Sequence, residues 1–234
     1  MPRLRRLTSI LSSSNSIIML RTRRSAFALL LFALPLVVAC KDEQAAVRTA
    51  PVGPAPDSFR VSFATSHGTF VIDVKRAWAP RGADRFRDLV ADGFFEENRF
   101  FRVLPGFIAQ FGVNNDRKSN ERWEATPLAD DPVREKNTRG TIVFASDGPN
   151  SRTHQFFINL KDNTNLDKQG FAPFGRVVEG MGVVDSIYSG YGEDPNYHLL
   201  ATLGNSYLKR VFPKLDFIQR ATIAGSGTGA PPRP

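Results

Sequence analysis

One arginine and one glutamine stand among apolar residues in the run 100–110, FFRVLPGFIAQ. Side chains alternate between the two faces of an extended strand. Arg102 and Gln110 can therefore share a surface with Phe107 only if the Pro105-Gly106 pair turns the chain. A lone cation, an amide and an exposed phenyl ring describe a shallow, mostly apolar pocket with few polar anchors. Such a pocket suits a neutral ring attached to a peptide carbonyl, as in a proline residue.

Short strands are expected to position these residues. Apolar side chains alternate on both sides of Ser66-His67-Gly68, which predicts a β-hairpin. A helical pattern begins at Pro80 and ends at Gly93. Further strands are expected over residues 99–103, 107–112, 141–145, 155–160, 174–178 and 214–223, with a second short helix over 182–189.

Many short strands with only two helices favour a mainly β fold, a closed antiparallel barrel, over a parallel α/β sheet. Residues 114–136 and 190–210 are polar or turn-rich and are expected to form loops. Phe156 and Phe157 are adjacent in the run 155–160, so on a strand they point to opposite faces. We expect Phe156 to lie in the core.

The first 39 residues have the parts of an export signal. Three arginines between residues 21 and 24 precede an apolar run, 26–39, that is shorter than the roughly 20 residues needed to span a bilayer. The stretch before Met19 adds nothing to such a signal, and Met19 is a candidate for the true start of translation. We predict a signal peptide over residues 1–39.

Cys40, the only cysteine of the chain, follows this run in the sequence LVVAC. The pattern resembles the lipobox of bacterial lipoproteins, in which the cysteine becomes the new N-terminus and carries the lipid. An ordinary cleaved signal with an incidental cysteine, or an uncleaved anchor, is the alternative. We expect lipidation of Cys40 and anchoring to a bacterial membrane on its periplasmic side. The outer membrane is preferred, because Lys41 is no obvious inner-membrane retention signal.

The composition of the rest of the chain predicts a tether, one folded domain and a tail. Residues 40–58 are rich in alanine and proline and cannot bury a core, so a flexible tether is expected between the lipid and the domain. Residues 59–223 are predicted to form one folded domain, and residues 224–234 a disordered tail.

The formal charge of +8 resembles that of a nucleic-acid-binding protein until its position is considered. Residues 1–39 hold six of the 31 basic residues and none of the 23 acidic ones, which leaves 25 basic against 23 acidic residues in the remainder. No nucleic-acid partner is therefore expected. His67, His154 and His198 are scattered, so no metal site is expected either, and His154 is predicted to be a polar loop residue.

Several ordered motifs resemble those of the cyclophilins, the peptidyl-prolyl cis-trans isomerases. They extend over the whole predicted domain, and their number and order make them far more specific than any one short pattern. The matching segments are residues 100–110 (FFRVLPGFIAQ), 139–145 (RGTIVFA), 148–151 (GPNS), 155–158 (QFFI), 165–167 (NLD) and 174–181 (FGRVVEGM).

The resemblance implies an eight-stranded antiparallel β-barrel capped by two α-helices and the activity of a prolyl isomerase. Matched motif to motif, it implies Arg102 and Gln110 as the catalytic pair. The substrate-binding positions that it implies are Phe107, Ile108, Ala145, Gln155, Phe157, Leu166 and Phe171.

Catalysis of rotation about an X–Pro bond requires few chemical groups. Rotation about a peptide bond costs roughly 18–20 kcal/mol because amide resonance is lost. The cis and trans forms of an X–Pro bond differ by only about 0.5–1 kcal/mol, so the reaction needs a catalyst and no energy source. A fixed guanidinium can stabilise the twisted amide while an apolar pocket holds the ring. No nucleophile, metal or acid–base pair takes part, and no cofactor is expected.

Some positions depart from the pattern of the cyclophilins. The histidine that usually precedes the arginine is Phe101, the glycine and aspartate after the glutamine are Phe111 and Val113, and the pocket methionine is Ile108. Asn165 replaces the tryptophan that contacts cyclosporin in drug-sensitive members. Weak cyclosporin binding is therefore expected, while the arginine is retained.

The leading hypothesis is a membrane-tethered isomerase that assists the folding of exported proteins. Its expected partners are X–Pro bonds in unfolded or flexible polypeptides, and the protein is expected to be a monomer. A proline-peptide binding module, or a chaperone with incidental isomerase activity, is the alternative. Retention of Arg102 and Gln110 argues against a purely binding role.

Overall fold

The computed structural model describes residues 53–224. The predicted signal peptide, Cys40, most of the tether and nearly all of the predicted tail lie outside the described residues. Among the helices of the described part, none combines the length and the apolar character needed to cross a membrane.

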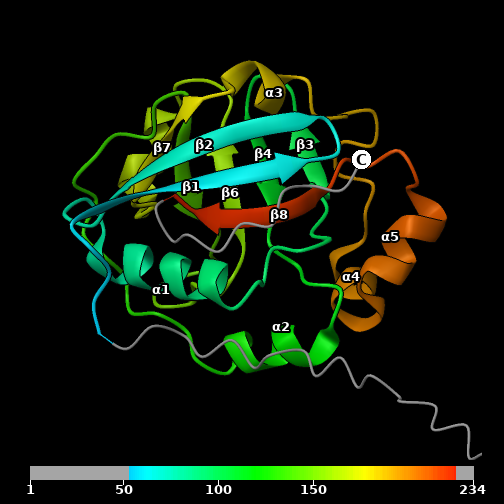
Figure 1. Ribbon diagram of the computed structural model, residues 1–234, viewed down its shortest axis with the longest axis horizontal. Helices are drawn as coiled ribbons and strands as arrows, with labels where there is room; N and C mark the ends of the chain where they lie inside the picture. The colour runs from blue at the N-terminus through cyan, green and yellow to red at the C-terminus, as the bar shows by residue number, and fades with distance from the viewer. Residues whose placement is uncertain (1–52, 225–234) are drawn as a thin grey trace, which may run out of the picture. The chain divides into compact units, whose positions relative to one another are not determined.

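Eight strands form one antiparallel sheet in the order β3-β4-β6-β5-β7-β2-β1-β8 (Figure 1). The mainly β fold with eight antiparallel strands is as predicted. The strands are β1 (Ser58–Thr65), β2 (Gly68–Lys75), β3 (Arg102–Leu104), β4 (Ile108–Phe111), β5 (Thr141–Phe144), β6 (Phe156–Asn159), β7 (Gly175–Glu179) and β8 (Ile218–Ile223).

The two edges of the sheet meet only over a short distance. β3 and β8 are not paired as strands. Residues at and just before the starts of these strands join instead: the Phe100 amide donates to the Asp216 carbonyl at 3.0 Å, and the Ile218 amide donates to the Asn98 carbonyl at 2.8 Å. A single bridge, Arg99 to Phe217, lies between these bonds. The continuous closure expected of the barrel is thus replaced by a local bridge, because β3 is only three residues long.

The described chain has more helix than the sequence predicted. The two expected helices correspond to α1 (Pro80–Ala91) and α3 (Met181–Asp185). The prediction that residues 114–136 and 190–210 form loops is wrong in part, since they contain α2 (Arg117–Glu124), α4 (Tyr197–Leu203) and most of α5 (Asn205–Val211). Helices of two turns are too short for a clear period in the sequence. Their available signals were the caps Asp116 and Asn196, whose side chains accept from Lys118 and Leu199 amides.

The interior of the sheet is filled with phenylalanine. Phe63 of β1 stacks on Phe70 of β2 with ring centroids 5.0 Å apart. Phe156 of β6 is completely buried, and its ring centroid lies 4.4 Å from that of Phe144 in β5. The prediction that Phe156 belongs to the core is confirmed. Each aromatic contact adds about 0.5–1.5 kcal/mol beyond the burial of area.

A second, smaller core joins α4 and α5 to the sheet. It consists of Phe101, Val113, Leu200, Tyr207, Leu208, Phe212 and Leu215, with Tyr191 packed against it. Phe101 and Val113 are two of the positions that depart from the cyclophilin pattern. Their apolar side chains are explained by these helices, which cover them.

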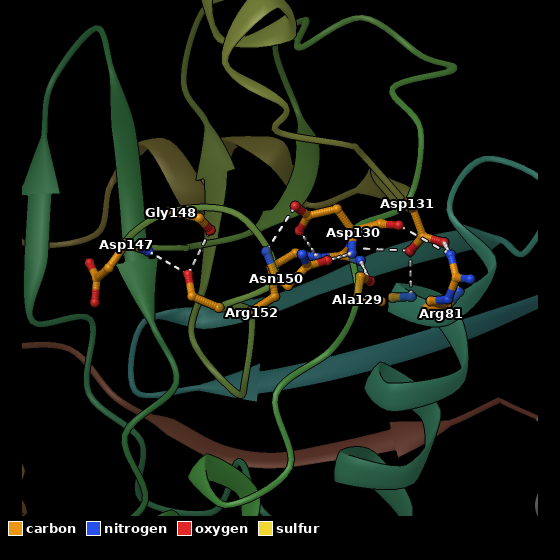
Figure 2. Close-up of polar contacts among 10 residues, drawn as sticks. Arg81, Ala129, Asp130, Asp131, Asp147, Gly148, Asn150 and Arg152 are labelled. Atoms are coloured by element: carbon orange, nitrogen blue, oxygen red, sulfur yellow. Dashed lines mark hydrogen bonds and ion pairs between the residues drawn. The ribbon is translucent and has the colours of Figure 1, made fainter.

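A polar network ties the loop before β6 to the start of α1 (Figure 2). Ala79 supplies no side-chain cap to α1, and Asp131 takes its place by accepting from the Arg81 and Gly82 amides at 3.1 and 2.9 Å. Buried Arg152 donates to the same carboxylate at 3.1 Å. Asn150 and Asp130 exchange two bonds of 2.9 Å between backbone amide and side-chain oxygen. The network fixes residues 147–152, which border the site described next.

Candidate active site

The hairpin of β3 and β4 brings the two predicted polar residues together. Gly106, with φ of 68°, allows the turn, and the Phe107 amide donates to the Leu104 carbonyl at 2.9 Å. This turn pairs Arg102 directly with Gln110. Nη1 of the guanidinium lies 3.4 Å from Oε1 of the amide, and the Arg102 Cζ lies 5.9 Å from the centre of the Phe107 ring. Arg102, Gln110 and Phe107 therefore share one surface, which the turn at Pro105-Gly106 makes possible.

An apolar cluster beside this pair is separate from the main core. Buried Ile108, Val143, Phe157 and Leu166 form it, and the partly buried Phe107, Ala145 and Phe171 pack against it. Leu166 comes from the 3₁₀ helix Thr164–Gln169, and the Phe157 and Phe171 rings meet edge to face at 5.6 Å. Over this cluster lies an open cavity of about 310 Å³, which Arg102 and Gln110 also line. Its size and apolar floor suit a small ring.

Two neighbouring phenylalanines of β6 point into different regions, one into the main core and the other into the apolar cluster. Phe156 lies in the main core and Phe157 in the apolar cluster of the cavity. Gln110 pairs with Phe157 across β4 and β6, which carries the polar residue to the rim of the cavity. Of the predicted substrate-binding residues, only Gln155 does not line this cavity.

The polar side chains form one continuous row. Gln110 Nε2 donates to Gln155 Oε1 at 3.1 Å, and Gln155 Nε2 donates to the Tyr197 hydroxyl at 2.6 Å. At the other end, Arg102 donates from Nε to Glu193 Oε1 at 2.7 Å and approaches the same oxygen with Nη2 at 2.5 Å. The row therefore runs Glu193–Arg102–Gln110–Gln155–Tyr197.

Glu193 and Tyr197 were not predicted from the sequence. Both belong to the segment 191–211, which holds α4 and α5 and is called the outer wall below. Neither residue lies in a segment that matched a motif. The signal that existed was indirect: apolar Phe101 and Val113, each within three residues of Arg102 or Gln110, require a covering element.

A second cavity of about 500 Å³ lies between the outer wall and the sheet. It shares five lining residues with the first cavity: Arg102, Gln110, Ala145, Ser146 and Asp147. The outer wall contributes Glu193, Pro195, Tyr197 and Ala201. Burial raises the pKa of Tyr197, and the nearby carboxylate of Glu124 raises it further. Its phenol therefore stays protonated in neutral solution.

His154 lies in the loop just before β6, as predicted, and its side chain also has a structural role. The side chain is buried, with Nδ1 lying 2.6 Å from the Gly112 carbonyl and Nε2 lying 3.2 Å from Glu124 Oε1. It connects the end of β4 to the last residue of α2. Gly112, with φ of 114°, is required there, because a side chain would collide with the His154 carbonyl.

Comparison with known proteins assigns a family to this arrangement. The family model described as cyclophilin type peptidyl-prolyl cis-trans isomerase/CLD matches residues 60–200. A peptidyl-prolyl cis-trans isomerase of Acinetobacter baylyi is 36% identical over 133 residues, which cover 54% of this chain and 70% of that protein. Peptidyl-prolyl cis-trans isomerase B of Escherichia coli is 36% identical over 136 residues, which cover 54% and 82% of the two chains.

Solved structures agree on the fold. The crystal structure of a cyclophilin type isomerase from Cryptosporidium parvum superposes with a TM-score of 0.56 at 20% identity and covers 73% of this chain and 99% of that one. Cyclophilin AquaCyp293 from Hirschia baltica gives the same TM-score at 16% identity, covering 75% and 77%.

Proposed function

The chain belongs to the cyclophilin-type peptidyl-prolyl cis-trans isomerases, and from this premise we propose that Arg102 is its catalytic residue. The observation that carries the assignment is the position of the guanidinium. It lies at the rim of the apolar cavity, between Gln110 and the Phe107 ring. A substrate proline whose ring enters that cavity presents its amide to the guanidinium.

The donors available for catalysis can be counted. A guanidinium has five N–H groups. Glu193 accepts from Nε and Nη2, and Gln110 faces Nη1. One N–H on each terminal nitrogen is left for a substrate. As the X–Pro bond twists, conjugation is lost and electron density returns to the proline nitrogen. A donor aimed at this nitrogen or at the carbonyl oxygen is worth more in the twisted state than in the planar one, so it accelerates rotation.

The apolar cluster supplies the second requirement. Phe107, Phe157 and Leu166 hold the proline ring still while the residue before it rotates. An acceleration on the order of 10⁵ requires only about 7 kcal/mol of preferential binding to the twisted state. Broad specificity follows, because the site addresses the ring and one amide, which are common to all X–Pro segments.

An isomerase assay coupled to a protease that cleaves only the trans peptide tests this function. Wild type is expected to accelerate the reaction, and Arg102→Ala is expected to lose about 100- to 1000-fold in kcat/KM, the usual effect of removing one aligned donor. Arg117→Ala is the matched control, because Arg117 is an exposed arginine of α2 that lines neither cavity. Full activity of Arg102→Ala would refute the role of the guanidinium.

We further propose that the isomerase is exported, carries a lipid on Cys40 and assists the folding of exported proteins as a monomer. The basic and apolar leader followed by a unique cysteine supports this proposal. Labelling of cells with a radioactive fatty acid is expected to mark the wild-type chain and not Cys40→Ser, which should leave the membrane fraction. Equal labelling of both chains would overturn the lipid anchor without affecting the isomerase assignment.

A further inference from the structure

The outer wall touches the polar row at both of its ends. Glu193 binds Arg102 at one end, and Tyr197 binds Gln155 at the other, only four residues further along the chain. The contacts join residues that are 91 and 42 positions apart in sequence. A single segment of the chain therefore encloses the side chains on which the proposed chemistry depends.

Gln110 alone holds the guanidinium weakly. Its contact with Nη1 is 3.4 Å long, beyond the usual 2.7–3.2 Å of an N–H···O bond. Glu193 binds at 2.7 and 2.5 Å through a charge-assisted contact on a different edge of the guanidinium. An arginine side chain has many rotamers, so the partner with the short contacts selects the orientation.

The backbone that carries Glu193 is anchored although its side chain is 62% exposed. The Tyr191 ring meets the Phe212 ring edge to face at 5.0 Å. The Asn196 amide donates to the Tyr207 hydroxyl at 3.1 Å, and the Asp194 amide donates to the Tyr191 carbonyl at 2.8 Å. These contacts connect both sides of Glu193 to the second core, so the carboxylate is presented from a fixed point.

We propose that Glu193 is a positioning residue for the isomerisation: it holds Arg102 by the Nε edge so that the free N–H groups face the substrate amide. The proposal rests on the proposed function of Arg102. It explains why the outer wall covers Phe101 and Val113, since this packing sets the distance between Glu193 and β3. The carboxylate occupies donors that the substrate does not need, because two others remain.

The test compares kcat and KM for an X–Pro peptide in wild type, Glu193→Gln and Asp194→Asn. The control makes the same change of charge one residue away, at an exposed side chain that lines neither cavity. Glu193→Gln is expected to lower kcat by about three- to tenfold with KM within about twofold, because orientation and not binding is lost. Asp194→Asn is expected to match wild type in both constants.

A double-mutant cycle separates positioning from a general loss of structure. In the Arg102→Ala background, Glu193→Gln is expected to have no further effect, because Glu193 acts through the guanidinium. An equal loss in both backgrounds would overturn the proposal. So would unchanged or increased activity of Glu193→Gln, the latter meaning that the carboxylate blocks the arginine. An inactive wild type would refute the proposed function instead, and the two failures are therefore distinguishable.

Discussion

The apolar cavity and the outer wall meet at the same guanidinium, yet two different cores hold them. The cavity is built on β4, β5 and β6, whose opposite face is the phenylalanine core. The wall depends on the second core beneath α4 and α5. In Figure 1 these two helices lie together, away from α1 and the β1–β2 hairpin. We therefore propose that the cavity side determines reactivity and that the outer wall determines the orientation of the arginine.

The sharpest division runs between two adjacent phenylalanines of β6. Phe156→Ala removes a completely buried ring from the main core and is expected to cost about 3–5 kcal/mol of the free energy of unfolding. Phe157→Ala is expected to cost less, because its ring borders an open cavity, and to reduce kcat/KM in the folded protein. Denaturant titration and isomerase assays of both variants measure this. Similar losses of stability would show that the cavity is not separate from the core.

The second core can be weakened by itself. Leu208→Ala deletes a buried side chain of α5 and is expected to cost about 2–5 kcal/mol locally. Hydrogen exchange of α4 and α5 amides should accelerate, while that of β1 and β2 amides stays slow. If all regions exchange faster together, the wall and the sheet unfold as one unit, and the comparison of two cores fails.

Truncation of a side chain at the rim of the cavity is expected to lower activity while leaving stability nearly unchanged. Phe107 is only partly buried, so Phe107→Ala is expected to lower kcat/KM by about tenfold, equivalent to about 1.4 kcal/mol of lost contact with the proline ring. Its thermal midpoint should remain close to that of wild type. A large fall of the midpoint with unchanged activity would reassign Phe107 to structure.

Substitution of Tyr197, at the end of the polar row away from Arg102, is expected to have the smallest effect on activity. Tyr197→Phe removes the oxygen that accepts from Gln155, and about a twofold loss of kcat is expected because a neutral hydrogen bond contributes only about 0.5–1.5 kcal/mol. The raised pKa of Tyr197 adds a pH test with a fixed sign. The stability difference between wild type and this variant should be constant below the normal pKa of tyrosine. As pH rises from that value toward the raised pKa of the folded state, wild type should lose stability relative to the variant, because the phenol ionises more readily in the unfolded chain. Denaturant titration measures this difference.

The residues of the cavity could be predicted from the sequence, whereas those of the outer wall could not. Arg102 and Gln110 could be paired because a short turn separates them and strand alternation fixes their faces. Phe156 and Phe157 could be separated by the same rule. Glu193 and Tyr197 could not be found, because their contacts depend on the packing of two helices too short to show a period.

The two positions that depart from the cyclophilin pattern indicated a covering element, but their residue types did not show which segment provides it. Phe101 and Val113 departed from the cyclophilin pattern, and the structure shows them beneath α4 and α5. An apolar residue next to a polar site implies a cover, but the covering segment begins about 80 residues later in the chain. The bridge between Arg99 and Phe217 was equally hidden, since it joins strand ends of separate segments.

The central claim is that Arg102 at the apolar cavity catalyses rotation of X–Pro bonds, and exchange NMR on a proline peptide tests it without a coupled protease. Wild type should increase the cis-to-trans and trans-to-cis rates together and leave the two populations unchanged, whereas Arg102→Ala should reduce this acceleration about 100- to 1000-fold. Exchange in the presence of folded wild type no faster than in the peptide alone, or equal acceleration by Arg102→Ala, would contradict the account.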